Sequence, residues 1–347
     1  MTTNQSTLNA RLAQPAPRTV APRVTVWPTG IVAALAWGVF GAVTWRWPNK
    51  MAGFNDWAYT EELGIVVLGV SAALLLLALT GGYASRSGPL QRAVAALRAA
   101  GPWLVALPLV FTAWEILTAK TAILPTPFFA PPQALIEVYL DDWQRLGDSA
   151  FNTLKLLGLG VGYGALAGFL IGVSIGWSRR IGYWIHPVLR VLGPLPSTAL
   201  LPLTFYFFPS SYSAAVFLIA LATAFPVAVL TWSGVAGVNK SYYDVARTMG
   251  ASGWFLVLRV AIPAALPQVF VGLFMGLGAS FSVLVTAEMM GVKSGLGWYL
   301  TWAQGWASYV NMYAALIVMA LLFSGVITLL FAVRDSALSW QKGTVKW

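Results

Sequence analysis

The stretch YYDVARTMGASGWFLVLRVAIPAALP, residues 242–267, lies between two long apolar runs and separates them with charged residues and two glycines. Ser241 and Asp244 have the spacing of a capping box, in which a hydroxyl and a carboxylate three residues later bond free N–H groups at a helix start. The spacing therefore predicts a helix that begins at Tyr242. Gly250 can adopt a positive φ without a Cβ clash, so we expect it to end that helix.

A second short helix is expected after this glycine. Ser252 is a suitable N-cap for it, and Trp254 would lie in its first turn. Pro263 is expected to end this helix, and Pro267 suits the first turn of the following apolar segment. The pattern alone fits two alternatives, an amphipathic helix pair at a membrane surface or an element that docks into a partner protein.

The composition on either side of this stretch is that of an all-α integral membrane protein. Of 347 residues, 58% are hydrophobic and 9% are charged, whereas soluble domains are about 25% charged. Runs of roughly 17–25 apolar residues have the length of membrane-spanning helices. About eight such helices are expected, at residues 28–45, 63–83, 102–119, 152–177, 186–208, 213–233, 265–288 and 307–333.

The basic residues are concentrated on one side of these spans. The segments before the first span and after spans two, four, six and eight hold fifteen of the 21 Lys and Arg residues, with two acids, Asp244 and Asp335. Cytoplasmic loops carry the excess of Lys and Arg, so we expect both termini in the cytoplasm. The net charge of +10 is then a signal of topology, and a nucleic-acid partner is not expected.

Several kinds of chemistry are missing from the sequence. The chain has no cysteine and one histidine, His186, which excludes thiolate and multi-histidine metal sites. It shows no Ser–His–acid set and no paired carboxylates, so the chain is not expected to be an enzyme. A G-x-x-x-x-G-K-[ST] phosphate loop is also missing, and we expect no cofactor in this chain.

The opening stretch resembles the EAA loop of ABC-importer permeases. That loop reads E-A-A, three residues, G, nine residues and I-x-L-P. Asp244-Val245-Ala246, Gly250 and Val260-Ala261-Ile262-Pro263 keep the spacing, with Asp in place of Glu and Val in place of Ala. Three more segments resemble the nitrate/taurine/alkanesulfonate permeases, namely ILPTP (123–127), LGPLPSTALLPLTFYF (192–207) and AEMMGVKSGLGWYL (287–300).

The resemblance implies the transmembrane permease of a type I ABC importer for a small solute, located in the cell inner (plasma) membrane. It implies a six-span core at 101–335 with cytoplasmic coupling helices at 241–262, preceded by a tail at 1–26 and two additional helices within 27–100, and followed by a cytoplasmic tail at 336–347. It also implies four kinds of partner: a separate ATPase dimer that holds ATP and Mg, a second permease, an external binding protein and membrane lipid. The coupling residues that it implies are Tyr243, Asp244, Ala246, Arg247, Gly250 and Ala251.

A translocation pathway is expected beside a break in the fifth predicted span. Pro194 and Pro196 interrupt helical geometry there, which membranes tolerate where backbone lines a cavity. The pathway candidates are Pro194, Pro196, Ser197, Thr198, Ser280, Ser282, Thr286 and Glu288. The alternative for each hydroxyl is a hydrogen bond back to its own helix. An ion-coupled secondary transporter or channel is the alternative function, although the spans carry few acids.

Two other features are expected to be structural. Glu115 falls late in the third span, where its side chain would reach the membrane interface. Glycines at four-residue spacing, from Gly160 to Gly176, predict a stripe for close helix packing, with a second permease as one candidate partner.

Overall fold

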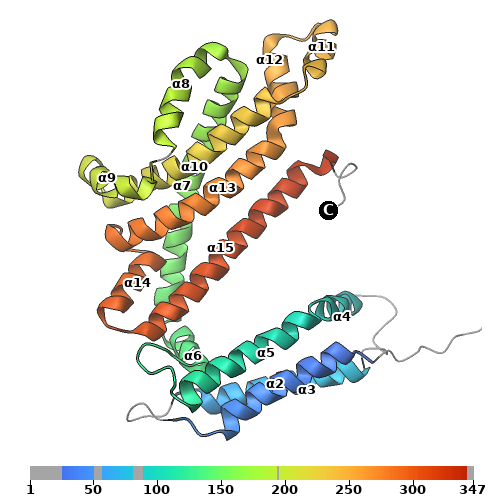
Figure 1. Cartoon of the computed structure of the whole chain (residues 1–347), viewed down its shortest axis with the longest axis vertical. Coiled ribbons are helices and arrows are strands. Elements are labelled where there is room, and N and C mark those ends of the chain that lie inside the picture. Colours follow the sequence, from blue (N-terminus) through green and yellow to red (C-terminus); the bar gives the residue numbers. More distant parts are fainter. Residues whose placement is uncertain (1–25, 51–56, 81–88, 194, 342–347) are drawn as a thin grey trace, which may run out of the picture. The chain divides into compact units, whose positions relative to one another are not determined.

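The computed structural model describes residues 26–50, 57–80, 89–193 and 195–341. The predicted N-terminal tail lies almost wholly outside these residues, as do Pro194 and half of the predicted C-terminal tail. Every regular element in the described part of the chain is a helix, and the chain divides into two compact units between Ile136 and Glu137 (Figure 1).

The first unit is a bundle of apolar helices. It contains α2 (Pro28–Arg46), α3 (Thr60–Thr80), α4 (Pro89–Ala99), α5 (Gly101–Glu115) with a π-helical turn at Ile116–Lys120, and the start of α6 (Pro132–Asp141). Helix α2 packs against both α3 and α5. The third predicted span thus packs with the first of the two predicted additional helices.

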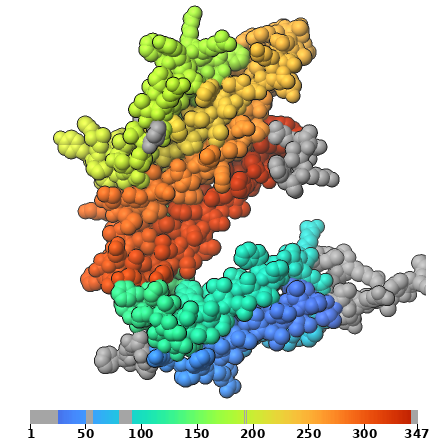
Figure 2. Space-filling view, viewed as in Figure 1, coloured from blue at the N-terminus to red at the C-terminus, as the bar shows by residue number. Residues whose placement is uncertain are grey.

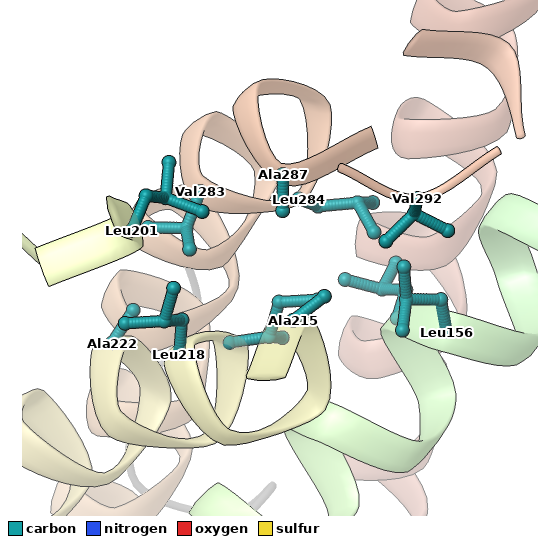
Figure 3. Close-up of a cluster of buried hydrophobic side chains, with 11 residues drawn as sticks. Leu156, Leu201, Ala215, Leu218, Ala222, Val283, Leu284, Ala287 and Val292 are labelled. Atoms are coloured by element: carbon teal, nitrogen blue, oxygen red, sulfur yellow. The ribbon is translucent and has the colours of Figure 1, made fainter. Parts of the chain in front are cut away.

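The second unit holds the remaining helices. These are α7 (Trp143–Trp177), α8 (Arg179–Leu192), α9 (Leu201–Phe207) after a 3₁₀ turn at Ser197–Leu200, α10 (Ser211–Ala236), α11 (Lys240–Thr248), α12 (Gly253–Phe255), a π-helical stretch at Leu256–Ala261, α13 (Ile262–Met290), α14 (Leu296–Gly305) and α15 (Tyr309–Ala337). Helix α10 is central, since it packs against α7 and α13. Figure 3 shows the core where Leu156, Leu218 and Leu284 of these three helices meet.

The glycine stripe lets α7 and α10 approach closely. A Cβ atom at Gly164, Gly168 or Gly172 would collide with backbone carbonyl oxygens of α10. Small residues at such a contact allow the van der Waals packing that holds helices together in lipid. The expectation of a packing stripe is therefore confirmed, and its partner is α10 of the same chain and not a second permease.

Seven helices of the described residues are long and apolar enough to span a membrane, against the eight expected. They are Pro28–Arg46, Thr60–Leu79, Gly101–Lys120, Trp143–Trp177, Ser211–Ala236, Gly253–Met290 and Tyr309–Ala337. The predicted span at 186–208 is instead two shorter helices, α8 and α9, separated after Gly193. The break falls at the Gly-Pro-x-Pro sequence, as predicted. Prolines interrupt helical hydrogen bonding, so no continuous helix forms there.

The helix pair at 240–262 differs from the expectation in two details. Helix α11 begins at Lys240, and its N-cap is Asn239, whose side chain accepts a hydrogen bond from the Ser241 N–H at 3.0 Å. The prediction of a Ser241–Asp244 capping box is therefore wrong, because Asn239, two residues before Ser241, supplies the cap.

Pro263 also does not end the second helix. A π-helical stretch precedes it, and the proline is the second residue of α13, so the helical run passes through it. One helical run thus continues from Gly253 to Met290. Two expectations are confirmed, since Gly250 has φ +83° and Ser252 caps the new helix by accepting from the Phe255 N–H at 3.4 Å.

Candidate functional site

Helices α11 and α12 form a short hairpin at one end of the second unit, beside the junction of α7 and α8 (Figure 1). Its turn is closed by two backbone hydrogen bonds, from Gly250 N–H to Arg247 O at 2.9 Å and from Ala251 N–H to Ala246 O at 3.0 Å. Both satisfy carbonyl groups at the end of α11, and the left-handed backbone they require falls on a glycine. The turn therefore fixes the angle between the two helices.

The outer surface of this hairpin is apolar and unpacked. Met249 is 83% exposed and Trp254 is 77% exposed, and Tyr242, Val245 and Leu258 are also exposed. The hairpin projects from the unit in Figure 2, where it is the gold segment at the upper right. A cluster of exposed apolar side chains of this kind marks a contact surface for another protein or a membrane.

The predicted coupling residues lie on different sides of α11. Tyr243 points inward, stacking edge-on against Trp177 with ring centroids 6.0 Å apart, and burial raises the pKa of its phenol. Asp244 and Arg247 are exposed and form an ion pair at 4.0 Å, which contributes little to stability. Ala246 and Ala251 are partly buried and Gly250 is exposed. Tyr243 therefore anchors the hairpin, while Asp244 and Arg247 remain accessible.

A groove of about 730 Å³ runs along this exposed apolar face of α11. Its lining includes Tyr242, Val245, Met249, Arg259 and Trp340. Most of these residues were missed from the sequence, although the spacing 242, 245, 246 and 249 is that of one helical face. Trp340 could not have been found that way, because only the packing of the C-terminal segment brings it to the groove.

A cavity of about 410 Å³ lies beside the break between α8 and α9. Its lining includes Pro196, Ser197, Thr198 and Ser282, together with apolar residues of α8, α10 and α13. The structure thus brings together four of the predicted pathway residues, which come from segments some 85 positions apart in the sequence. Pro194 falls outside the described residues.

Three predicted pathway residues do not line this cavity. Ser280 is buried between α10 and α13, where it contacts Thr223 and donates to Gly276 O at 2.7 Å. Thr286 donates back to Ser282 O at 2.8 Å. The bond back to the helix, which was the alternative for these hydroxyls, is therefore present in both. Glu288 is the third and lies at the far end of α13.

Glu288 joins three helices. It is 1% exposed and accepts hydrogen bonds from the Thr153 hydroxyl and from the Gly297 N–H, both at 2.8 Å. The Thr153 hydroxyl in turn accepts from the Leu296 N–H. Glu288 and Thr153 thus accept hydrogen bonds from free N–H groups at the start of α14. The N-cap residue of that helix, Gly295, has no side chain that could do so.

A second buried acid lies in the first unit. Glu115 is fully buried and pairs with Lys120 at 3.3 Å, so the expectation that it reaches the membrane interface is wrong. Lys120 also donates to the carbonyl oxygens of Thr44 and Trp47 at the end of α2. The pair therefore ties the end of α5 to α2.

The comparisons with known proteins agree with this architecture. Residues 164–337 match the family model described as the binding-protein-dependent transport system inner membrane component. The chain is 30% identical over 224 residues to a putative aliphatic sulfonates transport permease protein SsuC of Bacillus subtilis, covering 62% of this chain and 78% of that protein.

Two further relatives cover most of their own length. The nitrate import permease protein NrtB of Synechococcus elongatus is 26% identical over 240 residues, covering 66% of this chain and 84% of that protein. A putative aliphatic sulfonates transport permease protein SsuC of Escherichia coli is 30% identical over 228 residues, with 64% and 84% covered.

The chain belongs to the family of binding-protein-dependent transport system inner membrane components. It is a multi-pass membrane protein and the permease subunit of an ABC importer of the nitrate and sulfonate type. As in its relatives, ATP is hydrolysed by a separate subunit, and a substrate-binding protein belongs to the system.

Proposed function

We propose that this permease imports a small solute delivered by an external binding protein, with both termini in the cytoplasm and the α11–α12 hairpin seated on a cytoplasmic ATPase dimer. The ATP and Mg are held by that dimer, and a second permease subunit, identical or homologous, completes the pathway. The observation that carries the proposal is the unpacked apolar surface on either side of the rigid glycine turn at Gly250.

The hairpin is suited to transmitting motion to the spans. Its second half, Gly253–Phe255, continues without interruption through the π-helical stretch into α13. Because this helical run is continuous, displacement of the hairpin by an ATPase would be carried along it to residues at the cavity, such as Ser282. Tyr243 holds the other half of the hairpin against α7.

Co-purification with the ATPase tests the docking surface. Val245→Asp places a carboxylate on the exposed apolar face of α11, and we expect it to reduce the ATPase recovered with the permease at least tenfold. Ser241→Asp is the matched control, because it adds the same charge at an exposed position outside the groove lining. Equal recovery of the ATPase with both variants would contradict the proposed coupling surface.

Uptake into proteoliposomes tests the energy source. The reconstituted permease, ATPase and binding protein should accumulate solute when ATP is present and stop when it is removed. Transport that continues without ATP and is abolished by dissipating the proton gradient would instead support an ion-coupled transporter.

A further inference from the structure

The cavity beside the α8–α9 break is uncharged. Side chains of Ile185, Val188, Leu221 and Phe225 form much of its wall. None of its lining residues, within the part of the chain that the structure describes, is Lys, Arg, His, Asp or Glu. An ionised solute would therefore lose its hydration shell there without gaining a charged partner.

Three hydroxyl groups at this cavity have no hydrogen-bond partner among the described residues. The side chains of Ser197, Thr198 and Ser282 make no hydrogen bond to any described residue, although other hydroxyls in these helices do. Thr204 of α9, for example, donates to Leu201 O at 3.0 Å and Thr286 of α13 donates to Ser282 O at 2.8 Å. The cavity thus presents neutral donors and acceptors that are available to a solute.

The size of the cavity suits an organic molecule. A cavity of about 150 Å³ lined by apolar side chains is large enough to bind benzene. The volume here is about 410 Å³, which also falls in the range of about 300–1,000 Å³ found for small-molecule sites. A ring with a polar substituent fits this volume, whereas a single inorganic anion would leave most of the apolar wall without contacts.

Cationic side chains line a groove that adjoins the cavity. That groove is lined by His186, Arg190 and Trp232, and it shares Leu189, Gly193 and Phe225 with the cavity. Arg190 is exposed and does not line the cavity. An anionic head group could therefore meet Arg190 in the groove, but it would find no such charge inside the cavity.

We propose that this cavity is a binding site for an uncharged organic solute, with a ring-sized apolar body against the wall and a hydrogen-bonding head group at Ser197, Thr198 and Ser282. The inference rests on the proposed function and names the chemistry of the solute that the permease accepts. Selection between neutral and ionised forms of one molecule would then occur inside the membrane, after delivery by the binding protein.

Equilibrium binding to the purified full complex in lipid nanodiscs tests this site, with benzamide, benzoate and nitrate as probes. Benzamide and benzoate share a ring and differ in the charge of the head group at pH 7. We expect benzamide to bind at least tenfold more tightly than benzoate, and nitrate not to compete. Ala279→Phe, which fills the cavity, should weaken benzamide binding at least tenfold, and the triple change Ser197→Ala, Thr198→Val, Ser282→Ala should weaken it severalfold.

Ala320→Phe is the matched control, because Ala320 is exposed on α15 and does not line the cavity. Tighter binding of benzoate or nitrate, or benzamide binding that Ala279→Phe leaves unchanged, would overturn the inference. Benzoate binding that is lost in both Ala279→Phe and Arg190→Gln would assign the site to organic anions instead.

ATP hydrolysis stimulated by the binding protein is measured in the same preparations. Stimulated hydrolysis together with preferential benzoate binding would refute the neutral-solute site and leave the proposed function standing. A permease that recovers no ATPase at all would refute the proposed function itself.

Discussion

The carboxylate of Glu288 lies 2.8 Å from the backbone nitrogen of Gly297, so a side chain at the end of α13 caps the start of α14. Thr153 of α7 bonds the same carboxylate and also the Leu296 N–H. The acid and the glycine-rich segment that follows it are thus one structural unit, in which the carboxylate replaces the capping side chain that Gly295 lacks.

Removing this carboxylate should destabilise the fold. In Glu288→Ala the Gly297 N–H loses its buried partner and the Thr153 hydroxyl loses one of its two, and we expect a cost of about 2–3 kcal/mol because hydrogen bonds to charged groups exceed neutral ones. Thermal unfolding of the purified protein in detergent measures the effect. Glu61→Ala, at an exposed position in the first turn of α3, should unfold at the wild-type temperature, and a similar loss in both variants would contradict the capping role.

Gly295→Ala should destabilise the protein at least as much as Glu288→Ala does. Gly295 has φ +100°, and an added Cβ atom would collide with the Glu288 carboxylate. Its ψ of 172° places it in a region that is essentially restricted to glycine, where a side chain is expected to cost about 1–3 kcal/mol of backbone strain, with the collision in addition. Gly305→Ala, where no atom lies within 4 Å of the added Cβ, is the control. Unchanged unfolding of Gly295→Ala would show that the segment relaxes freely.

The role of the glycine stripe on α7 can be tested with a control substitution on the same helix. Gly168→Leu should separate α7 from α10, because its Cβ would meet the Ala224 carbonyl oxygen, whereas Gly162 has open space around it. We expect Gly168→Leu to reduce folded, monodisperse protein severalfold in size-exclusion chromatography and Gly162→Leu to behave as wild type. Equal recovery of both variants would mean that the α7–α10 contact is not required for folding.

The ion pair of the first unit should be sensitive to the loss of one partner. Lys120→Ala leaves Glu115 buried without its cation, which typically costs about 3–5 kcal/mol. The double variant Glu115→Gln, Lys120→Met should recover part of that loss, because no charge is left uncompensated. Lys155→Ala, at an exposed position on α7, is the control for loss of a lysine. The unfolding temperatures of these variants rank their stabilities. A double variant that is less stable than Lys120→Ala would contradict the pairing.

The glycine turn of the hairpin should affect coupling more than stability. In Gly250→Ala, strain at a positive φ is expected to displace α12 relative to α11, since no neighbouring atom blocks the added Cβ. ATP-driven uptake in proteoliposomes should fall at least fivefold while the unfolding temperature changes little. Gly253→Ala, which also has open space and no positive φ, should transport normally. Uptake by Gly250→Ala at the wild-type rate would show that the turn angle is not needed.

Local sequence determined the features that depend on a few neighbouring residues. Apolar runs predicted the seven observed spans, the proline pair predicted the break after Gly193, and Gly250 and Ser252 predicted the turn and the second cap. Each of these follows from a residue's own backbone freedom, hydrogen-bonding groups or hydropathy, so no distant contact is needed to recognise it.

Tertiary structure decided which side chain meets which. The sequence was compatible with Ser280 in a pathway or bonded back to its own helix, with the α7 glycines against a second permease, and with Glu115 at the membrane interface. Ser280 contacts Thr223 of α10, and the α7 glycines also pack against α10, which is distant in the sequence. Glu115 and Lys120 are close in the sequence, but their pair is buried because it packs against α2. Periodicity gives the face of a helix, but only packing gives the atoms opposite that face, because these come from residues that the local pattern does not contain.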